Sequence, residues 1–117
     1  MEPRNAVASL SALAHEGRLA VFRMLIQAGP DGLAAGEIAR RLDTPPNTLS
    51  ANLNILLNAN LVENRRDGRS IIYTARYEDM SRLLEFLMED CCGGSPEICE
   101  RLSAVLARSH CEDVATA

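Results

Sequence analysis

Residues 46–75 read PNTLSANLNILLNANLVENRRDGRSIIYTA, and the two halves of this stretch show different patterns. Leucines recur in its first half at helical intervals: Leu49, Leu53 and Leu56. Pro46 suits the first turn of a helix, because the N–H that proline lacks would have no partner there. Asn60 suits the left-handed conformation that often ends a helix. The first half therefore predicts a helix over residues 46–59.

The second half of the stretch alternates between apolar and polar residues on both sides of Asp67-Gly68. This dipeptide is a strong signal for a two-residue hairpin turn. The strands are therefore predicted at 61–66 and 69–75. The hairpin carries three arginines that could reach DNA phosphates or the minor groove: Arg65, Arg66 and Arg69.

The flanking segments show helical spacing of apolar residues, interrupted by glycine and proline. Gly17 is expected to interrupt the chain between the first two helices. The expected helices are 6–14, 18–28, a short one around 38–42, 78–90 and 96–108. A short helix, a tight turn, a second helix and a basic hairpin predict a winged helix-turn-helix fold, mainly α with a β-hairpin wing. We expect one domain over residues 1–117.

Charge is unevenly distributed along a chain whose net charge is −4. Residues 36–76 carry six arginines and four acidic residues, a net charge of +2, whereas residues 77–117 have a net charge of −6. DNA affinity depends on where cations are placed more than on their total. The polar face of the helix over 46–59 could meet base edges in the major groove. Double-stranded DNA is therefore the predicted partner, and a solvated polar helix face is the alternative.

Composition excludes several other classes of protein. No apolar run approaches the length of a membrane span, and the N-terminus has no signal-peptide core, so a cytoplasmic location is expected. No phosphate-cradling loop surrounds any cysteine, so an enzyme is not expected. The hydrophobic fraction of 47% is ample for a core.

Four segments together resemble the ArsR/SmtB family of bacterial metal-responsive repressors. They are LSALAHEGRLAVFRML (10–25), EIARRL (37–42), NTLSANLNIL (47–56) and LV…RRDGRSIIYTA (61–75). The resemblance covers residues 6–90. It implies a homodimer joined by the first and last helices, and the apolar stripes at 7–14 and 98–106 fit that role. A monomer core completed by these stripes is the alternative.

The resemblance also implies which residues of the recognition helix read DNA. The family's Ser-x-His-His-Leu motif corresponds to Ser50-Ala-Asn-Leu, without either histidine. Base contacts carry over to the outward positions of this helix, and the hairpin arginines join them. The candidate DNA-binding residues are Asn47, Thr48, Ser50, Ala51, Asn54, Arg65, Arg66 and Arg69.

Three of the four cysteines lie in the sequence CCGGSPEIC at residues 91–99. Soft thiolates bind soft ions, and As(III) takes three sulfurs in a trigonal pyramid. Gly93-Gly94 would free the backbone so that Cys91 and Cys92 could turn to one centre with Cys99. This pattern is similar to an arsenic-responsive branch of the family. A three-thiolate As(III) site is predicted in a sensor segment over 91–111, with Sb(III) or a trivalent methylarsenical as alternative ligands.

Other uses of the cluster stay open. Cys91 or Cys92 could pair with Cys99 in a redox or persulfide sensor. Cd(II), Pb(II) or Zn(II) could bind with Cys111 as a fourth ligand. His110 could join such a site, whereas His15 is expected to be structural or solvated. Incidental or buried cysteines are the remaining alternative.

The predicted function is a repressor of an arsenic resistance operon that leaves its operator DNA when trivalent arsenic binds Cys91, Cys92 and Cys99. The alternative of the same fold is a repressor that responds to thiol oxidation, persulfide, or Cd, Pb or Zn. A different class, a metal buffer without a regulatory role, would bind metal but would not depend on the hairpin arginines.

Overall fold

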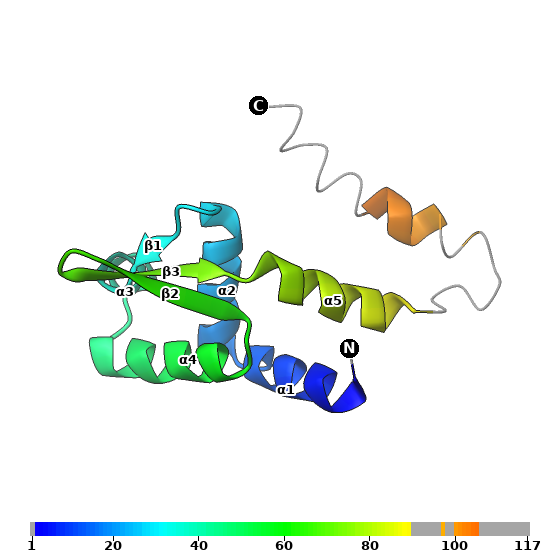
Figure 1. Cartoon of the computed structure of the whole chain (residues 1–117), viewed down its shortest axis with the longest axis horizontal. Coiled ribbons are helices and arrows are strands. Elements are labelled where there is room, and N and C mark those ends of the chain that lie inside the picture. The colour runs from blue at the N-terminus through cyan, green and yellow to red at the C-terminus, as the bar shows by residue number, and fades with distance from the viewer. Residues whose placement is uncertain (1, 90–96, 98–99, 106–117) are drawn as a thin grey trace. The chain divides into compact units, whose positions relative to one another are not determined.

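The computed structural model of the protein describes residues 2–89, 97 and 100–105 (Figure 1). The chain divides into two units, residues 1–86 and residues 87–117. In the second unit, residues 100–105 are helical. The sensor segment expected at 91–111 belongs to this second unit, and the expectation of a single domain stays a prediction.

The elements follow one another as helix, helix, strand, two helices, hairpin and helix, which confirms the winged helix-turn-helix fold. They are α1 (Pro3–Leu13), α2 (Glu16–Ala28), β1 (Leu33–Ala34), α3 (Ala35–Leu42), α4 (Pro46–Asn58), β2 (Val62–Asp67), β3 (Ser70–Ala75) and α5 (Tyr77–Met88). No helix in the part of the chain that the structure describes is long and apolar enough to cross a membrane.

The break between α1 and α2 falls at Ala14–His15, and the expectation that Gly17 makes it was wrong. Gly17 lies in the first turn of α2. His15 caps this helix, because its Nδ1 accepts hydrogen bonds from the backbone N–H of Gly17 at 3.1 Å and of Arg18 at 3.4 Å. A side-chain acceptor at this position satisfies N–H groups that have no partner within the helix. His15 is therefore structural, as expected.

The turn from α3 to α4 uses a residue in the left-handed conformation. Asp43 has φ 48° at the end of α3, and the backbone N–H of Thr44 donates to the Ala39 carbonyl at 3.0 Å. Pro46 opens α4, as predicted. Asn60, with φ 59°, follows α4 in the left-handed conformation expected of it.

The core lies between α2, α3, α4 and the bases of the wing strands. Its side chains are almost wholly apolar and aliphatic, and burial of one such side chain stabilises the fold by about 1.5–3 kcal/mol. The most deeply buried members are Val21, Leu25, Ile38, Leu53, Leu56, Leu61 and Val62. This core fixes the angle between α3 and α4.

The sheet has three antiparallel strands in the order β1-β3-β2. Asp67 pairs with Ser70, so the two turn residues are Gly68 and Arg69, and the expected Asp67-Gly68 turn was wrong by one residue. Gly68 has φ 63°, which fits a type II′ turn with glycine at its first central position. Val62 and Ala75 pair at the base of the hairpin, and both are buried.

Strand β1 was not predicted, because two residues are too few to show the alternation of apolar and polar side chains that marks a strand. Leu33 pairs with Tyr73, and Ala34 pairs with Ile72. The preceding Gly32 lies against β3, where a Cβ added to it would be 2.4 Å from the Tyr73 carbonyl oxygen. The loop between α2 and β1 is therefore fitted closely to the wing.

Candidate nucleic-acid interface

Helix α4 presents one polar and one apolar face. Its leucines at helical spacing are buried, which leaves the intervening side chains in solvent. The exposed residues include all five that the sequence predicts for base contact: Asn47, Thr48, Ser50, Ala51 and Asn54. Asn52 is only 7% exposed, and its Nδ2 lies beside Gly17. Asn52 therefore belongs to the packing of α4 against α2.

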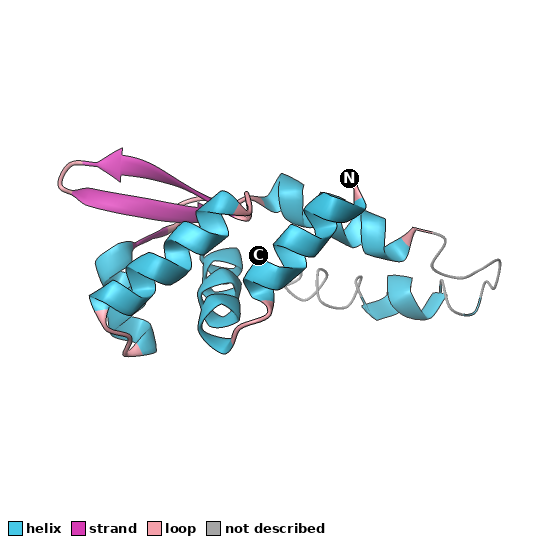
Figure 2. Ribbon diagram, turned by 90° about the horizontal axis from the view of Figure 1, so that it is seen from below, coloured by secondary structure: helices cyan, strands magenta, loops and turns pink. Residues whose placement is uncertain are grey.

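The N-terminal end of α4 is open to a ligand. The residue at its cap position, Pro45, makes no side-chain hydrogen bond to the helix. The first N–H groups of a helix lack partners within it, and together with the helix dipole they favour an anion such as a phosphate. In both ribbon views this end of α4 lies at the same end of the molecule as the tip of the hairpin (Figures 1 and 2).

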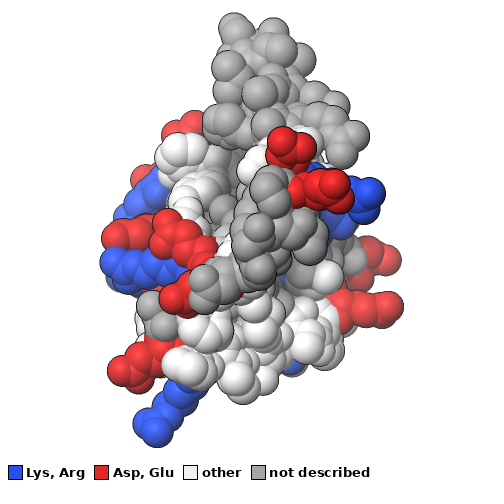
Figure 3. Space-filling view, turned by 90° about the vertical axis from the view of Figure 1, so that its right-hand side faces the viewer, with Lys and Arg blue, Asp and Glu red and all other residues white. Residues whose placement is uncertain are grey.

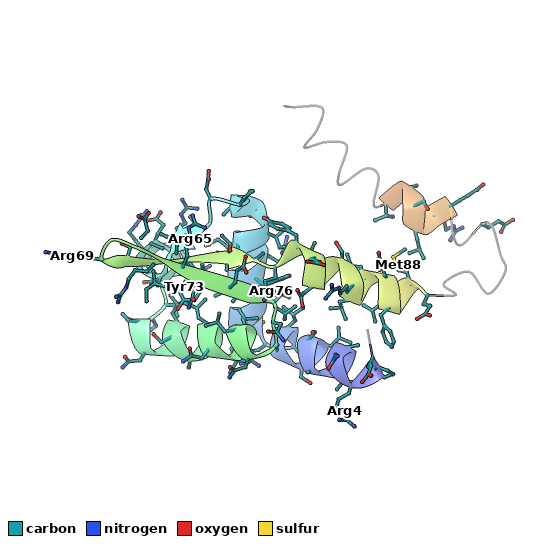
Figure 4. All side chains as sticks on the ribbon, in the orientation of Figure 1. Arg4, Arg65, Arg69, Tyr73, Arg76 and Met88 are labelled. Carbon is teal, nitrogen blue, oxygen red and sulfur yellow. The ribbon has the colours of Figure 1, made fainter. Side chains whose placement is uncertain are left out.

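The hairpin, which we call the wing (β2, Gly68-Arg69 and β3), exposes all three predicted arginines. Arg69 lies at its tip and points away from the helices (Figure 4). Arg65 and Arg66 are consecutive in β2, so their side chains leave opposite faces of the strand. Their guanidinium groups therefore lie on opposite sides of the wing.

Arg65 is also anchored within the protein. Its Nη2 donates to the backbone carbonyl of Asp31 at 2.9 Å. A guanidinium has five N–H donors, so this bond leaves others for a phosphate. The anchor was not predicted, because the acceptor is a backbone carbonyl in a turn and no residue pattern marks it.

A second cationic group lies on α3. Glu37 accepts hydrogen bonds from Arg40 Nε at 3.2 Å and from Arg41 Nε at 2.7 Å. These bonds, first that of Arg40 and then that of Arg41, lower the pKa of Glu37 from 4.5 to about 2. One carboxylate thus orients two exposed guanidinium groups, and the cations of α3 are partly neutralised.

We expect the Glu37 carboxyl group to titrate near pH 2 in the folded protein. A carboxyl whose pKa is lowered on folding stabilises the folded state above its ordinary value of 4.5, and this contribution is lost as the pH falls through about 2. Carbon-13 NMR titration of the side chain measures the pKa directly. The double variant Arg40→Gln/Arg41→Gln should return it towards 4.5, and a wild-type value near 4.5 would contradict the ion-pair geometry.

The predicted metal ligands lie outside the described residues. This holds for Cys91, Cys92 and Cys99, and also for His110 and Cys111. Among the residues that the structure does describe, no group of three or more His, Cys, Asp or Glu side chains could hold a metal ion. The three-thiolate site therefore stays a prediction.

The sequence matches the helix-turn-helix domain family over residues 13–65. It is 32% identical over 82 residues to the transcriptional activator HlyU of Vibrio cholerae, and the match covers 70% of this chain and 73% of HlyU. The structure of reduced HlyU is similar to this one with a TM-score of 0.58 and 32% identity, over 72% of this chain and 88% of the HlyU chain.

Two further proteins extend the comparison. The biofilm growth-associated repressor of Agrobacterium fabrum is 34% identical over 83 residues, 71% of this chain and 68% of that protein. A homodimeric winged helix-turn-helix DNA-binding domain from Mycobacterium bovis, a possible ArsR-family regulator, has a TM-score of 0.62 and 29% identity, over 94% of this chain and 84% of that one. By fold and by sequence identity, the chain belongs to the ArsR-like family of winged helix-turn-helix transcriptional regulators.

Proposed function

We propose that the protein is a homodimeric repressor of an arsenic resistance operon that leaves its operator when As(III) binds Cys91, Cys92 and Cys99. The observation that supports the proposal is that the chain has both an exposed polar recognition helix beside a basic wing and three cysteines within the nine positions 91–99. HlyU is a transcriptional activator, whereas the Agrobacterium relative is a repressor, so relatives alone do not decide the direction of regulation. The cysteine cluster favours a ligand-released repressor.

The exposed residues of α4 are assigned to the major groove and the wing arginines to the backbone of the DNA. An asparagine such as Asn47 or Asn54 can pair with both the N6 and N7 groups of adenine. Arginines at the wing tip contact phosphates or the minor groove, and they position the protein without reading sequence directly. The open N-terminus of α4 supports the same placement, since it favours a phosphate.

Replacing Arg66 or Arg69 by glutamine should weaken operator binding and reduce the slope of log K against log salt by about 1 for each arginine–phosphate interaction removed. Fluorescence anisotropy of labelled operator DNA at several salt concentrations measures both quantities. Arg82→Gln is the matched control, because Arg82 is an exposed arginine on α5, outside the wing, and is paired with Glu78. A metal buffer would show no change with any of the three variants.

Exposed apolar side chains support the homodimer. Val7 and Leu10 on α1 are 61% and 41% exposed, and Leu84 on α5 is 39% exposed. Arg4 is the only charged residue of α1. Figure 3 shows an area of uncharged side chains in the lower part of the surface that it views, with acidic and basic groups at the edges of this area. A second copy would cover such an area and would place two recognition helices on two half-sites.

Three thiolates match the bonding preferences of trivalent arsenic. Thiolate is a soft ligand, and three sulfurs fill the three bonding directions of As(III). The cluster follows α5 in the chain, with only Glu89 and Asp90 between Met88 and Cys91. Ligation could therefore act on α5 and, through it, on the DNA-binding unit. An allosteric coupling of about 1–3 kcal/mol would suffice, which is the common range.

One observation favours testing a second trigger. One of the HlyU structures similar to this one is of the reduced protein. In this chain, Cys91 or Cys92 could form a disulfide or a persulfide-derived bridge with Cys99. The same repressor would then respond to oxidation, and Cd(II), Pb(II) or Zn(II) with Cys111 would be a further variant.

Counting free thiols distinguishes these triggers. The reduced chain has four cysteines, all reactive with a thiol reagent after denaturation. A three-thiolate arsenic site should leave Cys111 alone reactive when the reagent is added to the folded, arsenite-bound protein. A disulfide should leave two thiols, and a four-thiolate metal site should leave none. Four reactive thiols with arsenite present would contradict the proposed site.

A further inference from the structure

The side chain of Tyr77 joins the first turn of α5 to the last turn of α2. Its hydroxyl donates to the Ile26 carbonyl at 3.0 Å, with the Leu25 carbonyl at 3.5 Å. Helix α2 ends at Ala28, so both carbonyls are among the last four, which have no partner within the helix. The hydroxyl therefore fixes where α5 begins relative to the end of α2.

The loop that follows α2 is held against the wing. Its ends are joined by a hydrogen bond from the Gly32 N–H to the Gly29 carbonyl at 3.1 Å. Gly32 lies so close to β3 that a Cβ would contact the carbonyl oxygen of Tyr73 and the side chains of its neighbours. Between these glycines, the Asp31 carbonyl accepts the hydrogen bond from Arg65 in β2. The loop therefore has little freedom to move without moving Arg65.

The same junction is also connected through the backbone. The Arg76 N–H donates to the Leu61 carbonyl at 2.9 Å, and Arg76 Nε lies 3.0 Å from Asp79 Oδ1. These contacts tie the start of α5 to the base of β2 and β3. The first turn of α5 is thus linked to the wing on two sides, and Tyr77 makes the link that passes through α2.

We propose that Tyr77 is a positioning residue through which α5 sets the position of the wing for DNA binding. The inference rests on the proposed contact of the wing arginines with DNA. When the Tyr77 hydroxyl is bonded to Ile26, the loop over 29–32 holds Arg65 and the wing in place. A ligand that displaces α5 breaks this bond, loosens the hold of Asp31 on Arg65 and weakens the contacts of the wing with phosphate.

The first test needs neither DNA nor ligand. Tyr77→Phe removes the hydroxyl and keeps the ring, so a change far from Tyr77 reports the loss of its hydrogen bonds to α2. In amide NMR spectra, Tyr77→Phe should shift the signals of Gly32 and Gly68 and the Arg65 side-chain Nε–H. Shifts confined to the last turn of α2 and the first turn of α5 would overturn the proposal.

The second test is a double-mutant cycle on operator affinity. Tyr77→Phe alone should weaken binding roughly 2–10-fold, the range for removal of one neutral hydrogen bond. In an Arg65→Gln background it should cost nothing further, because the anchor to Asp31 is already gone. In an Arg66→Gln background, where the anchor persists, Tyr77→Phe should keep its effect. An equal weakening in both backgrounds would overturn the role of the anchor.

The two tests separate this inference from the proposed function. If Arg66→Gln and Arg69→Gln leave operator affinity unchanged, the proposed wing contact fails, and the NMR comparison still decides whether Tyr77 positions the wing. If those arginine variants weaken binding while Tyr77→Phe changes neither the Gly68 signal nor the affinity, the wing contact stands and the positioning role of Tyr77 is wrong.

Discussion

Serine in place of Cys92 should leave the operator affinity of the reduced protein unchanged and should abolish its release by arsenite. A serine hydroxyl is not a soft ligand and stays protonated at neutral pH, so As(III) would keep only two of its three sulfurs. For the wild-type protein we expect arsenite to weaken operator binding roughly 5–150-fold, the span of common allosteric couplings. The variant should show almost none of this change in anisotropy titrations.

Cys111→Ser is the matched control, because Cys111 lies outside the predicted trio. It should keep both operator binding and release. Failure of Cys92→Ser to bind DNA without arsenite would mean that the cluster has a structural role. Full release of Cys92→Ser by a trivalent methylarsenical, which needs two thiolates, would keep the repressor and change its ligand.

Alanine in place of Gly32 should destabilise the protein by about 2–5 kcal/mol, the sum of a backbone and a packing effect. Gly32 has φ +70°, where an L-residue is strained by about 1–2 kcal/mol. The added Cβ would also lie 2.4 Å from the Tyr73 carbonyl oxygen and 2.6 Å from Thr74 Cγ2. Such overpacking typically costs a further amount of about 1–3 kcal/mol. Urea unfolding monitored by circular dichroism measures the free energy of unfolding.

Two other glycines separate the causes of this destabilisation. Gly29 has φ +80° with no atom within 4 Å of an added Cβ, so Gly29→Ala should show backbone strain alone. Gly36 lies in α3, and its Cβ would also meet open space, so Gly36→Ala should stabilise the helix by about 0.5–1 kcal/mol. If Gly32→Ala proves as benign as Gly36→Ala, the close fit of the loop to β3 is wrong.

The recognition helix and the wing could be predicted because several local signals agree there. The leucine spacing, the proline at the helix start and Asn60 at its end all favour α4, and all five outward residues are exposed. In the wing, the alternation of apolar and polar residues and the turn signal at Gly68 both favour a hairpin. The turn was predicted one residue too early, which shifts every cross-strand pair by two residues, so that Val62 pairs with Ala75 and not with Tyr73. A shift of two residues keeps each side chain on the same face of the strand, so the alternation could not reveal it.

Other features depend on contacts that no local pattern reveals. His15 was not expected as a helix cap, since histidine is not among the preferred capping residues, yet its Nδ1 fills that role. Strand β1 exists because two residues meet β3 after a glycine that fits closely against it. Likewise, the hydrogen bonds of Arg65 and Tyr77 end on backbone carbonyls, at Asp31 and Ile26.

The cysteine cluster is a different case, because its prediction rests on the number and spacing of its thiols and on the chemistry of As(III). Cys91, Cys92 and Cys99 lie outside the described residues, so their convergence on one centre stays a prediction. The recognition helix, the wing and the junction at Tyr77 are the parts of the DNA-binding unit that a signal from this segment would have to reach.

The most direct measurement is the anisotropy of operator DNA, taken from the region upstream of the gene, bound to reduced protein and titrated with arsenite. We predict that operator binding weakens on titration and that the change saturates at one arsenite bound per subunit. Binding that persists with arsenite but is abolished by persulfide or Cd(II) would contradict arsenic as the trigger while keeping the repressor. An absence of DNA binding by the reduced, ligand-free protein would contradict the central claim.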